Sequence, residues 1–501
     1  MHRIQKSVHE AGVIVSSLKT FGFQRGQASF MSVWVMGILG LAIFTLPAGK
    51  ARATEYEVGP DKELAEINDV PWESIKAGDH VNILWRETPY KAKWVMFSRG
   101  TEAAPIIVHG VPAADGKLPV IDGNGASSRK ALDYWGGERS IIKLGGSSRP
   151  AGTLPAYITI ENLEIRSARP PNTYAGRGGK TTAYAGTAAS IFIENGDHLT
   201  IRNCTLHDSA NGLYASHNAR EITIEGCWIY DNGLQNSGFD HNTYTEASGI
   251  IFQYNHYGAL KKGSGGNNLK DRSSGCVIRY NWIEGGNREL DLVDAEGSES
   301  IRNDPRYRET FVYGNVLIEP AGDGNNQIVH YGGDSGKTDG YRKGTLYFFN
   351  NTVISKQEES TALFSLSTND EHVDCRNNII YVAGSGRSLA MLNKAGSMDL
   401  SNNWLKPGWV KSKEDDFTGT VNAPVHLIEG NSSSFVNEAK QDYHLAAGSS
   451  CIKAGSPLPT KIPAEHALLR EYVAHQSSRE IPNPSKGRDS LNIGAFQTAV
   501  K

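Results

Sequence analysis

The sequence contains little cysteine and no large excess of charge of either sign. Five cysteines in 501 residues are too few to build a disulfide scaffold for a chain of this length. The first 53 residues hold six Lys/Arg and one Glu, so the rest of the chain carries 45 basic and 53 acidic residues. A mildly acidic chain is a poor candidate for binding nucleic acid, because such proteins present a basic surface. The composition therefore excludes a small disulfide-rich protein and indicates no nucleic-acid partner.

Long hydrophobic runs are also missing, with one exception near the start. Basic residues such as Arg3 and Arg25 precede an apolar run from Met31, and the tripeptide ARA at 51–53 matches a cleavage signal. This pattern predicts a signal peptide over residues 1–53 and a secreted or periplasmic mature protein. The apolar run approaches the length of a membrane span, so an uncleaved anchor over residues 31–49 is the alternative. Only in that case would a membrane be a partner.

Helix-length amphipathic stretches are absent after residue 53, and a short repeat takes their place. Each repeat has a short strand of alternating apolar residues, a corner and a second apolar stub, as in ITIEGCWI (222–229) and CVIRYNWI (276–283). Successive corners are 23 to 41 residues apart, and the widest gap predicts one further turn around residues 189–196. The corners fall on Leu163, Cys204, Cys227, Asn255, Asn281, Asn315, Asn351, Asn378 and Asn403.

The spacing of these strands predicts an all-β fold, a single right-handed parallel β-helix with loop insertions between its turns. Parallel α/β sheets need helices between their strands, whereas a coil whose turns stack on one another does not. Asparagine suits the corner because it tolerates left-handed backbone geometry and because stacked amides can hydrogen-bond along the coil. Cys204 and Cys227 fit the same column as stacked thiols rather than as a disulfide. A β-sandwich with irregular loops is the alternative.

Both ends of the predicted coil resemble a known group of enzymes. VPWESIKAGDHVNILW (70–85) and SRGTEAAPIIVHGVPAADGKLPVIDG (98–123) resemble the opening of bacterial β-helix polysaccharide lyases. DYHLAAGSSCIKAG (442–455) and NIGAF (492–496) are similar to the closing segment of that group, which includes alginate lyases and chondroitinase B. The resemblance implies the pectin lyase-like fold, and because such ends also occur on β-helix hydrolases and epimerases it is specific for architecture. We place the β-helix at residues 54–430 and a closing segment packed on it at 431–501.

Counting back from the corners Asn255 and Asn281 aligns the strands that precede them. HNTYTEA (241–247) then pairs with NNLKDRS (267–273). Alternation along both strands places three side chains of each on one outward face. Adjacent strands are about 4.8 Å apart, so these side chains form one polar patch. Its predicted members are Asn242, Tyr244 and Glu246, next to Asn268, Lys270 and Arg272.

The next two strands extend this patch. ELDLVDAEG (289–297) turns Asp291 outward beside Lys270, and QIVHYGG (327–333) brings His330 next to it. His241 precedes the first strand of the patch and either takes part in chemistry or caps its turn. Lys270 itself could also be an ordinary solvated charge on a strand.

A calcium ion is the one cofactor that the sequence suggests, and no cofactor is the alternative. Asp291, Asp294 and Glu296 are spaced so that they could share a cation. The same carboxylates could be plain loop acids.

The residue types of the patch suit cleavage of a uronate-containing polysaccharide by β-elimination. That reaction needs a base, a group that neutralises the uronate carboxylate and an acid for the leaving oxygen. We assign Lys270 as the base, Arg272 as the two-pronged carboxylate clamp, and Tyr244 or His241 as the acid. The lyases that the chain resembles also place a lysine base and an arginine here, but their arginine comes from the next turn, within a Leu-Arg-His-Gly stretch. The predicted substrate-binding residues are Asn242, Asn268, Glu246, Asp291 and His330.

The predicted function is therefore that of an exported monomer acting on an acidic polysaccharide, with lyase activity the leading hypothesis. One alternative is a β-helix glycoside hydrolase that uses two carboxylates, such as Asp291 with Asp294 or Glu296. The others are a C5-epimerase and a non-catalytic polysaccharide-binding protein of exopolysaccharide export.

Overall fold

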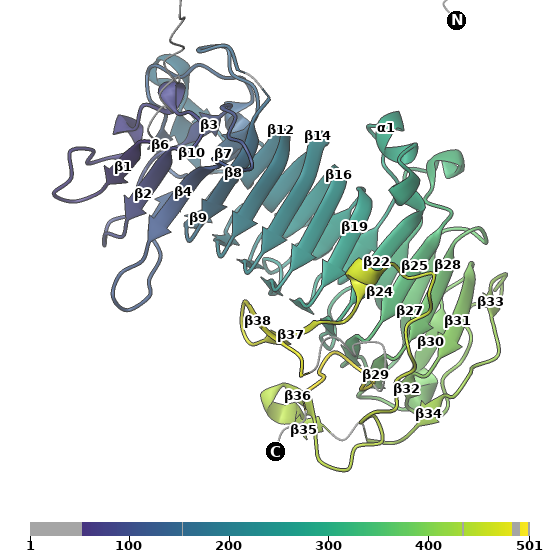
Figure 1. Ribbon diagram of the computed structural model, residues 1–501. Helices are drawn as coiled ribbons and strands as arrows, with labels where there is room; N and C mark the ends of the chain where they lie inside the picture. Colours follow the sequence, from purple (N-terminus) through teal and green to yellow (C-terminus); the bar gives the residue numbers. More distant parts are fainter. Residues whose placement is uncertain (1–52, 153, 433–434, 483–490, 499–501) are drawn as a thin grey trace, which may run out of the picture. The chain divides into compact units, whose positions relative to one another are not determined.

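In the computed structural model, the chain coils into three parallel sheets. The structure describes residues 53–152, 154–432, 435–482 and 491–498, so the predicted signal peptide and anchor lie outside the described residues apart from residue 53. The described residues form one compact unit. Its strands stack side by side along the coil (Figure 1). The predicted right-handed parallel β-helix is confirmed.

One turn of the coil, or rung, shows how the chain builds the three sheets, which we name faces 1, 2 and 3. Strand β16 (Thr243–Gln253) begins on face 1 and continues onto face 2. The next strand, β17 (His256–Tyr257), lies on face 3. The chain then returns through a loop to β18 (Leu269–Asp271), which pairs in parallel with the start of β16. Each later rung repeats this path.

The strands fall into the three faces as follows. Shared by faces 1 and 2 are β12 (Ala189–Arg202), β14 (Asn211–Glu225) and β16. Face 1 also has β3 (Trp94–Met96), β7 (Ser140–Leu144), β18, β21 (Leu290–Leu292), β24 (Gln327–Tyr331), β27 (Thr361–Leu366) and β30 (Leu389–Leu392). Face 2 also has β1 (Glu55–Val58), β2 (His80–Leu84), β4 (Ile106–Val111), β8 (Ala156–Glu161), β19 (Ser274–Arg279), β22 (Glu309–Tyr313), β25 (Thr345–Phe349), β28 (His372–Arg376), β31 (Ser397–Ser401) and β33 (Thr420–Val421). Face 3 has β5 (Val120–Asp122), β9 (Glu164–Arg166), β13 (Thr205–His207), β15 (Trp228–Tyr230), β17, β20 (Trp282–Glu284), β23 (Val316–Glu319), β26 (Thr352–Ser355), β29 (Ile379–Val382), β32 (Trp404–Leu405) and β34 (Ile428–Glu429).

The remaining elements lie in loops and in the C-terminal segment. The short strands are β6 (Ala126–Ser127), β10 (Thr173–Ala175), β11 (Thr181–Ala183), β35 (Phe435–Asn437), β36 (Asp442–Leu445), β37 (Arg470–Val473) and β38 (Ser477–Glu480). The one described α-helix is α1 (Glu299–Arg302), and the 3-10 helices are η1 (Ile67–Asp69), η2 (Trp72–Ser74), η3 (Gly137–Arg139), η4 (Arg177–Gly179), η5 (Pro305–Arg308), η6 (Thr338–Gly340), η7 (Gly386–Ser388), η8 (Glu438–Lys440) and η9 (Ala464–His466). Across the described ranges, no helix has both the length and the apolar character needed to cross a membrane.

Columns of apolar side chains, one from each rung, fill the interior. Alternate residues of each strand point inward, so the Ile, Leu and Val positions of neighbouring rungs pack on one another. Ile222, Ile250 and Cys276 occupy successive rungs of one such column, and each is at most 1% exposed. All five cysteines are buried and free, which confirms the interpretation of Cys204 and Cys227 as stacked thiols.

The predicted corner asparagines form a continuous hydrogen-bonded ladder, which we call the corner ladder. The side-chain oxygen of Asn281 accepts hydrogen bonds from the backbone N–H and the side-chain amide of Asn255, at 2.9 and 3.0 Å. The same pair of bonds repeats from rung to rung up to Asn403. The left-handed geometry falls one residue earlier than predicted, as at Tyr254 and Tyr280, with φ of 60° and 55°. The residue before each corner therefore makes the bend. Asparagine is required at the corner itself because its side-chain amide forms the ladder.

The predicted extra turn around residues 189–196 is wrong. β12 runs without a break from those residues to the strand end before Cys204, and β13 pairs directly with β9 of the preceding rung. The wide gap holds a loop with the antiparallel pair β10–β11 instead.

The segment after β34 packs on the outside of the coil. It contains two antiparallel pairs, β35–β36 and β37–β38. Leu468 joins an apolar cluster with Tyr313 of face 2, and Tyr443 and Tyr472 lie against Trp282 of face 3. This segment covers parts of faces 2 and 3, and face 1 carries the predicted polar patch.

Candidate functional site

One outward row of side chains runs along face 1, with one residue from each rung. The predicted alignment of Tyr244 with Lys270 is confirmed by the strand pairing, and so is the position of Asp291 beside Lys270 with His330 next to it. Their roles remain predictions. We call this set the face-1 row, and it comprises Val95, Lys143, Phe192, Tyr214, Tyr244, Lys270, Asp291, His330 and Ser365.

After Val95 and Lys143, the face-1 row has an aromatic stretch of Phe192, Tyr214 and Tyr244. The rings of Tyr214 and Tyr244 stack with centroids 5.0 Å apart and an interplanar angle of 10°. Phe192 meets Tyr214 edge-on at 5.5 Å, and His241 stacks on Tyr244 at 5.6 Å. Because Tyr214 and His241 both lie against the ring of Tyr244, its hydroxyl group is the part best placed for chemistry.

Lys270 begins the charged half and lies between two carboxylates. Its Nζ is 2.6 Å from Oδ2 of Asp291 and 2.5 Å from Oδ2 of Asp334. The side chain is 9% exposed. A base at this position must therefore first be released from these ion pairs.

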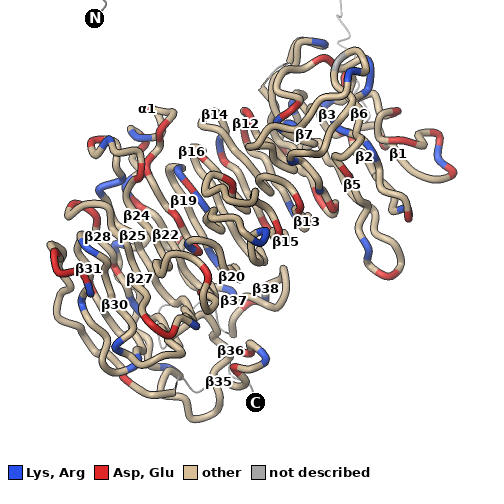
Figure 2. The backbone as a smooth tube through the Cα atoms, turned by 180° about the vertical axis from the view of Figure 1, so that it is seen from behind, with Lys and Arg blue, Asp and Glu red and all other residues tan. Residues whose placement is uncertain are grey.

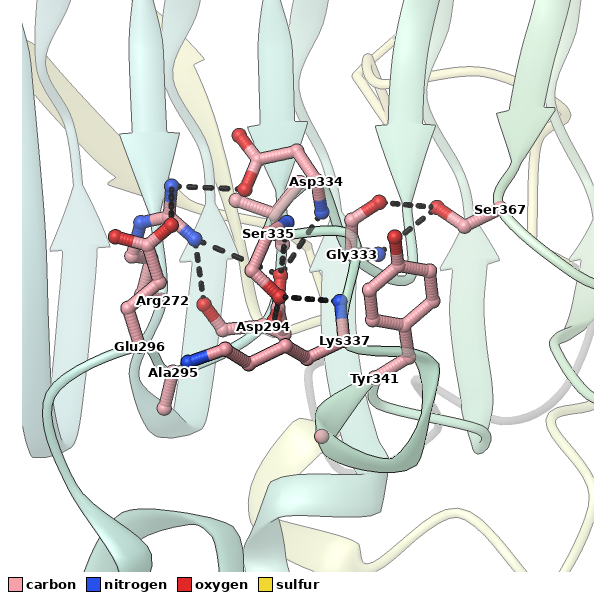
Figure 3. Close-up of polar contacts among 12 residues, drawn as sticks. Arg272, Asp294, Ala295, Glu296, Gly333, Asp334, Ser335, Lys337, Tyr341 and Ser367 are labelled. Carbon is pink, nitrogen blue, oxygen red and sulfur yellow. Dashed lines mark hydrogen bonds and ion pairs between the residues drawn. The ribbon is translucent and has the colours of Figure 1, made fainter. Parts of the chain in front are cut away.

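Arg272 is held by two hydrogen bonds and an ion pair on different sides of its guanidinium group. Nε donates to the Tyr244 hydroxyl at 2.8 Å, and one terminal nitrogen donates to the backbone oxygen of Asp294 at 2.6 Å. The other terminal nitrogen lies 2.8 Å from Oδ1 of Asp334 (Figure 3). Burial raises the pKa of Tyr244 well above its ordinary value, although the nearby charge of Arg272 acts in the opposite direction. The phenol next to Arg272 is therefore protonated at neutral pH.

Asp334 is the site residue that the sequence analysis missed. Its carboxylate bridges Lys270 and Arg272, and its side chain is 31% exposed. Burial alone would raise the pKa of Asp334, but the charges of Lys270 and Arg272 outweigh it and lower the pKa. The only sequence signal is an acid that closely follows the strand carrying His330, in GGDSG (332–336).

Asp294 positions the loop that carries Asp334. Its Oδ1 accepts hydrogen bonds from the backbone N–H groups of Asp334 and Ser335 at 2.8 and 3.3 Å, and its Oδ2 accepts one from the Ser335 hydroxyl (Figure 3). Asp294 is 2% exposed. It is thus a buried anchor of the loop and is not free for a ligand.

Asp291 is the most enclosed charge of the row, with 1% exposure. Burial opposes its ionisation, but the hydrogen bond with His330 and the charge of Lys270 hold the pKa of Asp291 well below its ordinary range. His330 Nδ1 is 2.7 Å from Asp291 Oδ1, and its Nε2 is 3.0 Å from the Ser367 hydroxyl. Ser367, His330 and Asp291 thus follow the order of a hydrolase triad, but the serine hydroxyl already donates to the Gly333 carbonyl at 2.8 Å. Ser367 therefore orients His330 and the Gly333 turn.

His241 is buried and neutral. Burial, followed by the charge of Lys270, lowers the pKa of His241 to about 3. Its Nδ1 accepts a hydrogen bond from the backbone N–H of Asn267 at 2.9 Å, so its proton is on Nε2. A neutral imidazole of this kind can donate a hydrogen bond from Nε2, and its role as the acid stays a prediction.

The predicted outward placement of Asn242 and Asn268 is wrong. Both are 0% exposed, and the side-chain amide of Asn242 donates to the side-chain oxygen of Asn268 at 2.8 Å. Asn268 in turn donates to the backbone oxygens of Glu284 and Gly285. Their amides are used inside the coil, so they support the fold rather than contact a substrate.

Glu246 is also more enclosed than predicted. It is 7% exposed and accepts a hydrogen bond from the backbone N–H of Gly297 at 2.9 Å. Burial raises the pKa of Glu246. Its observed contact is with the 296–298 loop.

Asp291, Asp294 and Glu296 do not converge on a shared calcium position. Asp291 faces Lys270 and His330, and Asp294 holds the Asp334 loop. Glu296 points to Arg272 at 3.6 Å. In the part of the chain that the structure describes, no group of three or more His, Cys, Asp or Glu side chains is arranged to hold a metal ion. The arrangement does not fit the calcium ligand set that the spacing suggested, and we assign no step to calcium.

A buried ion pair beneath the site fixes the strand that carries Lys270 and Arg272. Asp271 and Arg342 are both 0% exposed, and their side chains lie 3.3 Å apart. Arg342 also donates to the backbone oxygens of Val293 and Ser273, at 3.0 and 2.8 Å. Removing one partner of such a pair leaves an uncompensated buried charge. Arg342 therefore joins the backbone of two neighbouring rungs under the patch.

A pocket of about 580 Å³ opens next to Asp294 and Glu296, the two acids that lie 3.6 Å from Arg272, and its volume is within the size range of ligand sites. Basic and acidic residues are interspersed along the rungs of this molecule (Figure 2). The pocket combines both signs and is lined by Asp294, Ala295, Glu296, Arg302, Ser335, Lys337, Asp339 and Gly340.

Several proteins of known structure are distantly similar to the chain. Among solved structures, the chain is similar to pectate lyase Pel9A, with 13% identity, a TM-score of 0.46, and coverage of 90% of this chain and 97% of that one. It is also similar to an alginate lyase from Paenibacillus sp. str. FPU-7, with 14% identity, a TM-score of 0.41, and coverage of 70% and 95%. A GH136 lacto-N-biosidase from Eubacterium ramulus has 12% identity, a TM-score of 0.42, and coverage of 75% and 68%. These likenesses carry no argument about activity.

No curated protein matches the chain. Residues 151–322 match the family model described as "Right handed beta helix region". This stretch includes β12 to β23, and with them the strands that carry Tyr244, Lys270 and Asp291.

Proposed function

We propose that the protein is an exported lyase that cleaves a uronate-containing polysaccharide by β-elimination. One observation carries this proposal: the Asp334 carboxylate lies between Lys270 and Arg272, at 2.5 and 2.8 Å. The two cations thus form a carboxylate-binding pair, and the 31% exposure of Asp334 lets a ligand reach it from solvent. A uronate carboxylate offers the same oxygen atoms to the same donors.

Substrate binding in this proposal requires that the Asp334 side chain turns away, and proton abstraction requires in addition that Lys270 leaves its ion pair with Asp291. The backbone of its loop is held by Asp294, independently of the Asp334 carboxylate. Arg272 stays in place, because Tyr244 and the Asp294 carbonyl accept its other hydrogen bonds. The clamp is therefore preorganised around the position of the bound carboxylate.

Each remaining role in the reaction falls to one side chain. Arg272 neutralises the uronate carboxylate while the adjacent C–H bond breaks, and Lys270, acting as the neutral amine, takes the proton. The electron pair of that bond forms the carbon–carbon double bond, and the glycosidic C–O bond breaks. The departing oxygen takes a proton from the Tyr244 phenol, and Asp291 pairs with the ammonium formed on Lys270. All groups come from one chain, so we propose a monomer that needs no cofactor.

Hydrolysis fits the site less well. Glycoside hydrolases use two carboxyl groups on either side of the bond. Asp291 and Asp294 are both buried and bonded within the protein, and of the three predicted acids only Glu296 is well exposed, at 49%. Binding without catalysis is the second candidate, and the double ion pair of Lys270 is the observation that favours it.

The test is the ultraviolet absorbance of the unsaturated product on alginate, pectate, glycosaminoglycans and bacterial exopolysaccharides. We expect absorbance to rise with one uronate polymer and not with its carboxyl-reduced form. New reducing ends without absorbance would indicate a hydrolase, and a changed uronate composition without cleavage an epimerase. Binding with none of these changes would contradict the lyase proposal. Loss of activity in EDTA would contradict the cofactor-free mechanism.

A further inference from the structure

Arg139 lies over the aromatic stretch of the face-1 row, at Phe192 and Tyr214. It ends the 3-10 helix η3, which leads into β7 of face 1. Its guanidinium carbon is 4.4 Å from the ring centroid of Phe192 and 5.2 Å from that of Tyr214. Arg139 also forms a side-chain hydrogen bond with Tyr214, and a guanidinium group has further N–H donors beyond that one. Arg139 is partly exposed and forms no ion pair with any carboxylate of the described residues.

Three other cations in or next to the face-1 row, namely Lys143, Lys270 and Arg272, already have partners within the protein. Lys143 is 0% exposed, lies 3.0 Å from Glu194 and donates to the backbone oxygen of Trp135 at 2.9 Å. Lys270 and Arg272 are neutralised by Asp291 and Asp334. Arg139 therefore differs from them, because its charge is available to a ligand that lies along the row.

The rungs give the spacing between Arg139 and the carboxylate clamp. Arg139 contacts the rungs of Phe192 and Tyr214, whereas Arg272 contacts Tyr244 from the Lys270 rung. Adjacent strands are about 4.8 Å apart, so the two guanidinium groups lie about two rungs, or roughly 10 Å, from one another along the coil. A uronate polysaccharide extended along the row carries repeated acid groups, so that two of them can reach the two guanidinium groups.

We propose that Arg139 is a second acid-group subsite, which binds the carboxylate of a further uronate when a polymer lies along the face-1 row. The inference rests on the proposed function, since it takes Arg272 as the holder of the first carboxylate. The inference adds the direction in which the polysaccharide lies, from Arg272 over Tyr244 and Tyr214. It also predicts a preference for polymers in which a second uronate can reach Arg139.

The experiment is calorimetric titration of alginate and galacturonate oligosaccharides, from disaccharide to hexasaccharide, in a Lys270→Gln background that prevents turnover. We expect Arg139→Gln to weaken binding of the hexasaccharide roughly tenfold, as loss of a hydrogen-bonded charge does. Disaccharide binding should stay unchanged, and Arg139→Lys should restore part of the loss. Arg202→Gln is the matched control, because Arg202 is exposed, lies on face 2 at the far end of β12 and, among the described residues, pairs only with Glu161 and Glu225.

The outcomes separate the inference from the proposed function. If neither the wild-type protein nor the Lys270→Gln variant binds any uronate oligosaccharide, the proposed function and the inference both fail. If either protein binds them and Arg139→Gln behaves like Arg202→Gln, only the inference fails. An equal loss for every oligosaccharide length would also overturn it, since that pattern indicates a general electrostatic effect. Circular dichroism of each variant shows whether the coil is intact.

Discussion

The corner ladder and the face-1 row run along the same coil but are built in opposite ways. In the ladder, each rung from Asn255 to Asn403 repeats the same residue and the same two hydrogen bonds. In the row, neighbouring rungs carry a phenol, an ammonium group, a carboxylate and an imidazole. The identical rungs fix the register, and the fixed register brings unlike groups within contact distance. Each rung thus contributes to stability through its corner residue and to the proposed chemistry through its outward residue on face 1.

The largest effect should come from the charged half of the row. Lys270→Gln should lower turnover about 10²–10⁴-fold, because it removes the proposed base while keeping a hydrogen-bond donor toward Asp291. The melting temperature should fall, because buried Asp291 loses one of its cations, but Asp291 keeps His330 at 2.7 Å and the protein should stay folded at the assay temperature. Activity assays paired with calorimetry, with Arg202→Gln as control, check both. A fall in melting temperature that accounts for the lost activity would make Lys270 a structural residue.

A single substitution in the corner ladder should lower the stability of the fold. Asn315→Leu should cost about 3 kcal/mol of unfolding free energy, because it leaves the backbone N–H and side-chain amide of Asn281 without their acceptor. Denaturant titration measures the loss, and Asn325→Leu, on an exposed loop, is the control. A loss no larger than the control's would contradict the role assigned to the ladder.

Two buried acids, Glu289 and Glu319, test whether polar groups inside the coil must be uncharged. The amides of the corner ladder are uncharged. Burial raises the pKa of Glu319 to about 7, and burial next to Glu319 raises that of Glu289. Both oxygens of Glu289 lack a hydrogen-bond partner within the described ranges. Because folding favours the protonated acid, the contribution of Glu319 to stability is present at low pH and is lost as pH rises from about 4.5 to about 7.

Glu319→Gln should therefore raise unfolding free energy at pH 8 by about 3 kcal/mol and leave it nearly unchanged at pH 4. Thermal melts across this pH range measure the difference. Glu102→Gln, at an exposed position, provides the baseline. If both variants show the same pH dependence as the parent protein, Glu319 is not the titrating group.

The smallest effect should come from the carboxylate that bridges the two cations. Asp334→Ala should bind uronate oligosaccharides about three to ten times more tightly, because the ligand no longer competes with the side chain. Turnover should be retained. Titration and initial rates test this, with Asp339→Ala on the same loop as control. Loss of turnover would instead make Asp334 a catalytic group.

The repeated parts of the molecule could be predicted from the sequence because each rung repeats a local signal. Asn255 and Asn281 mark equivalent corners, and counting back from them aligned Tyr244 with Lys270 correctly. Alternation failed at Asn242 and Asn268, because β16 and β18 begin one residue later and these positions belong to the turn. The rule of alternating faces holds only within a strand.

The partners of the charged residues could not be predicted in the same way. Asp334 reaches Lys270 only because its loop is bonded to Asp294, which lies 40 residues earlier in the chain. Arg342 likewise reaches Asp271 from a loop 71 residues away. Neither contact follows from a repeat or from strand register, since each depends on the path of one loop.

The continuous ladder has a consequence for how such a protein can change over generations. Because the amide corners set the position of every rung, a loop between rungs can lengthen or shorten while the distance between neighbouring groups of the row stays that of one strand spacing. During evolution, residues of the row or loops between rungs can therefore change one rung at a time, while the rest of the binding surface keeps its geometry.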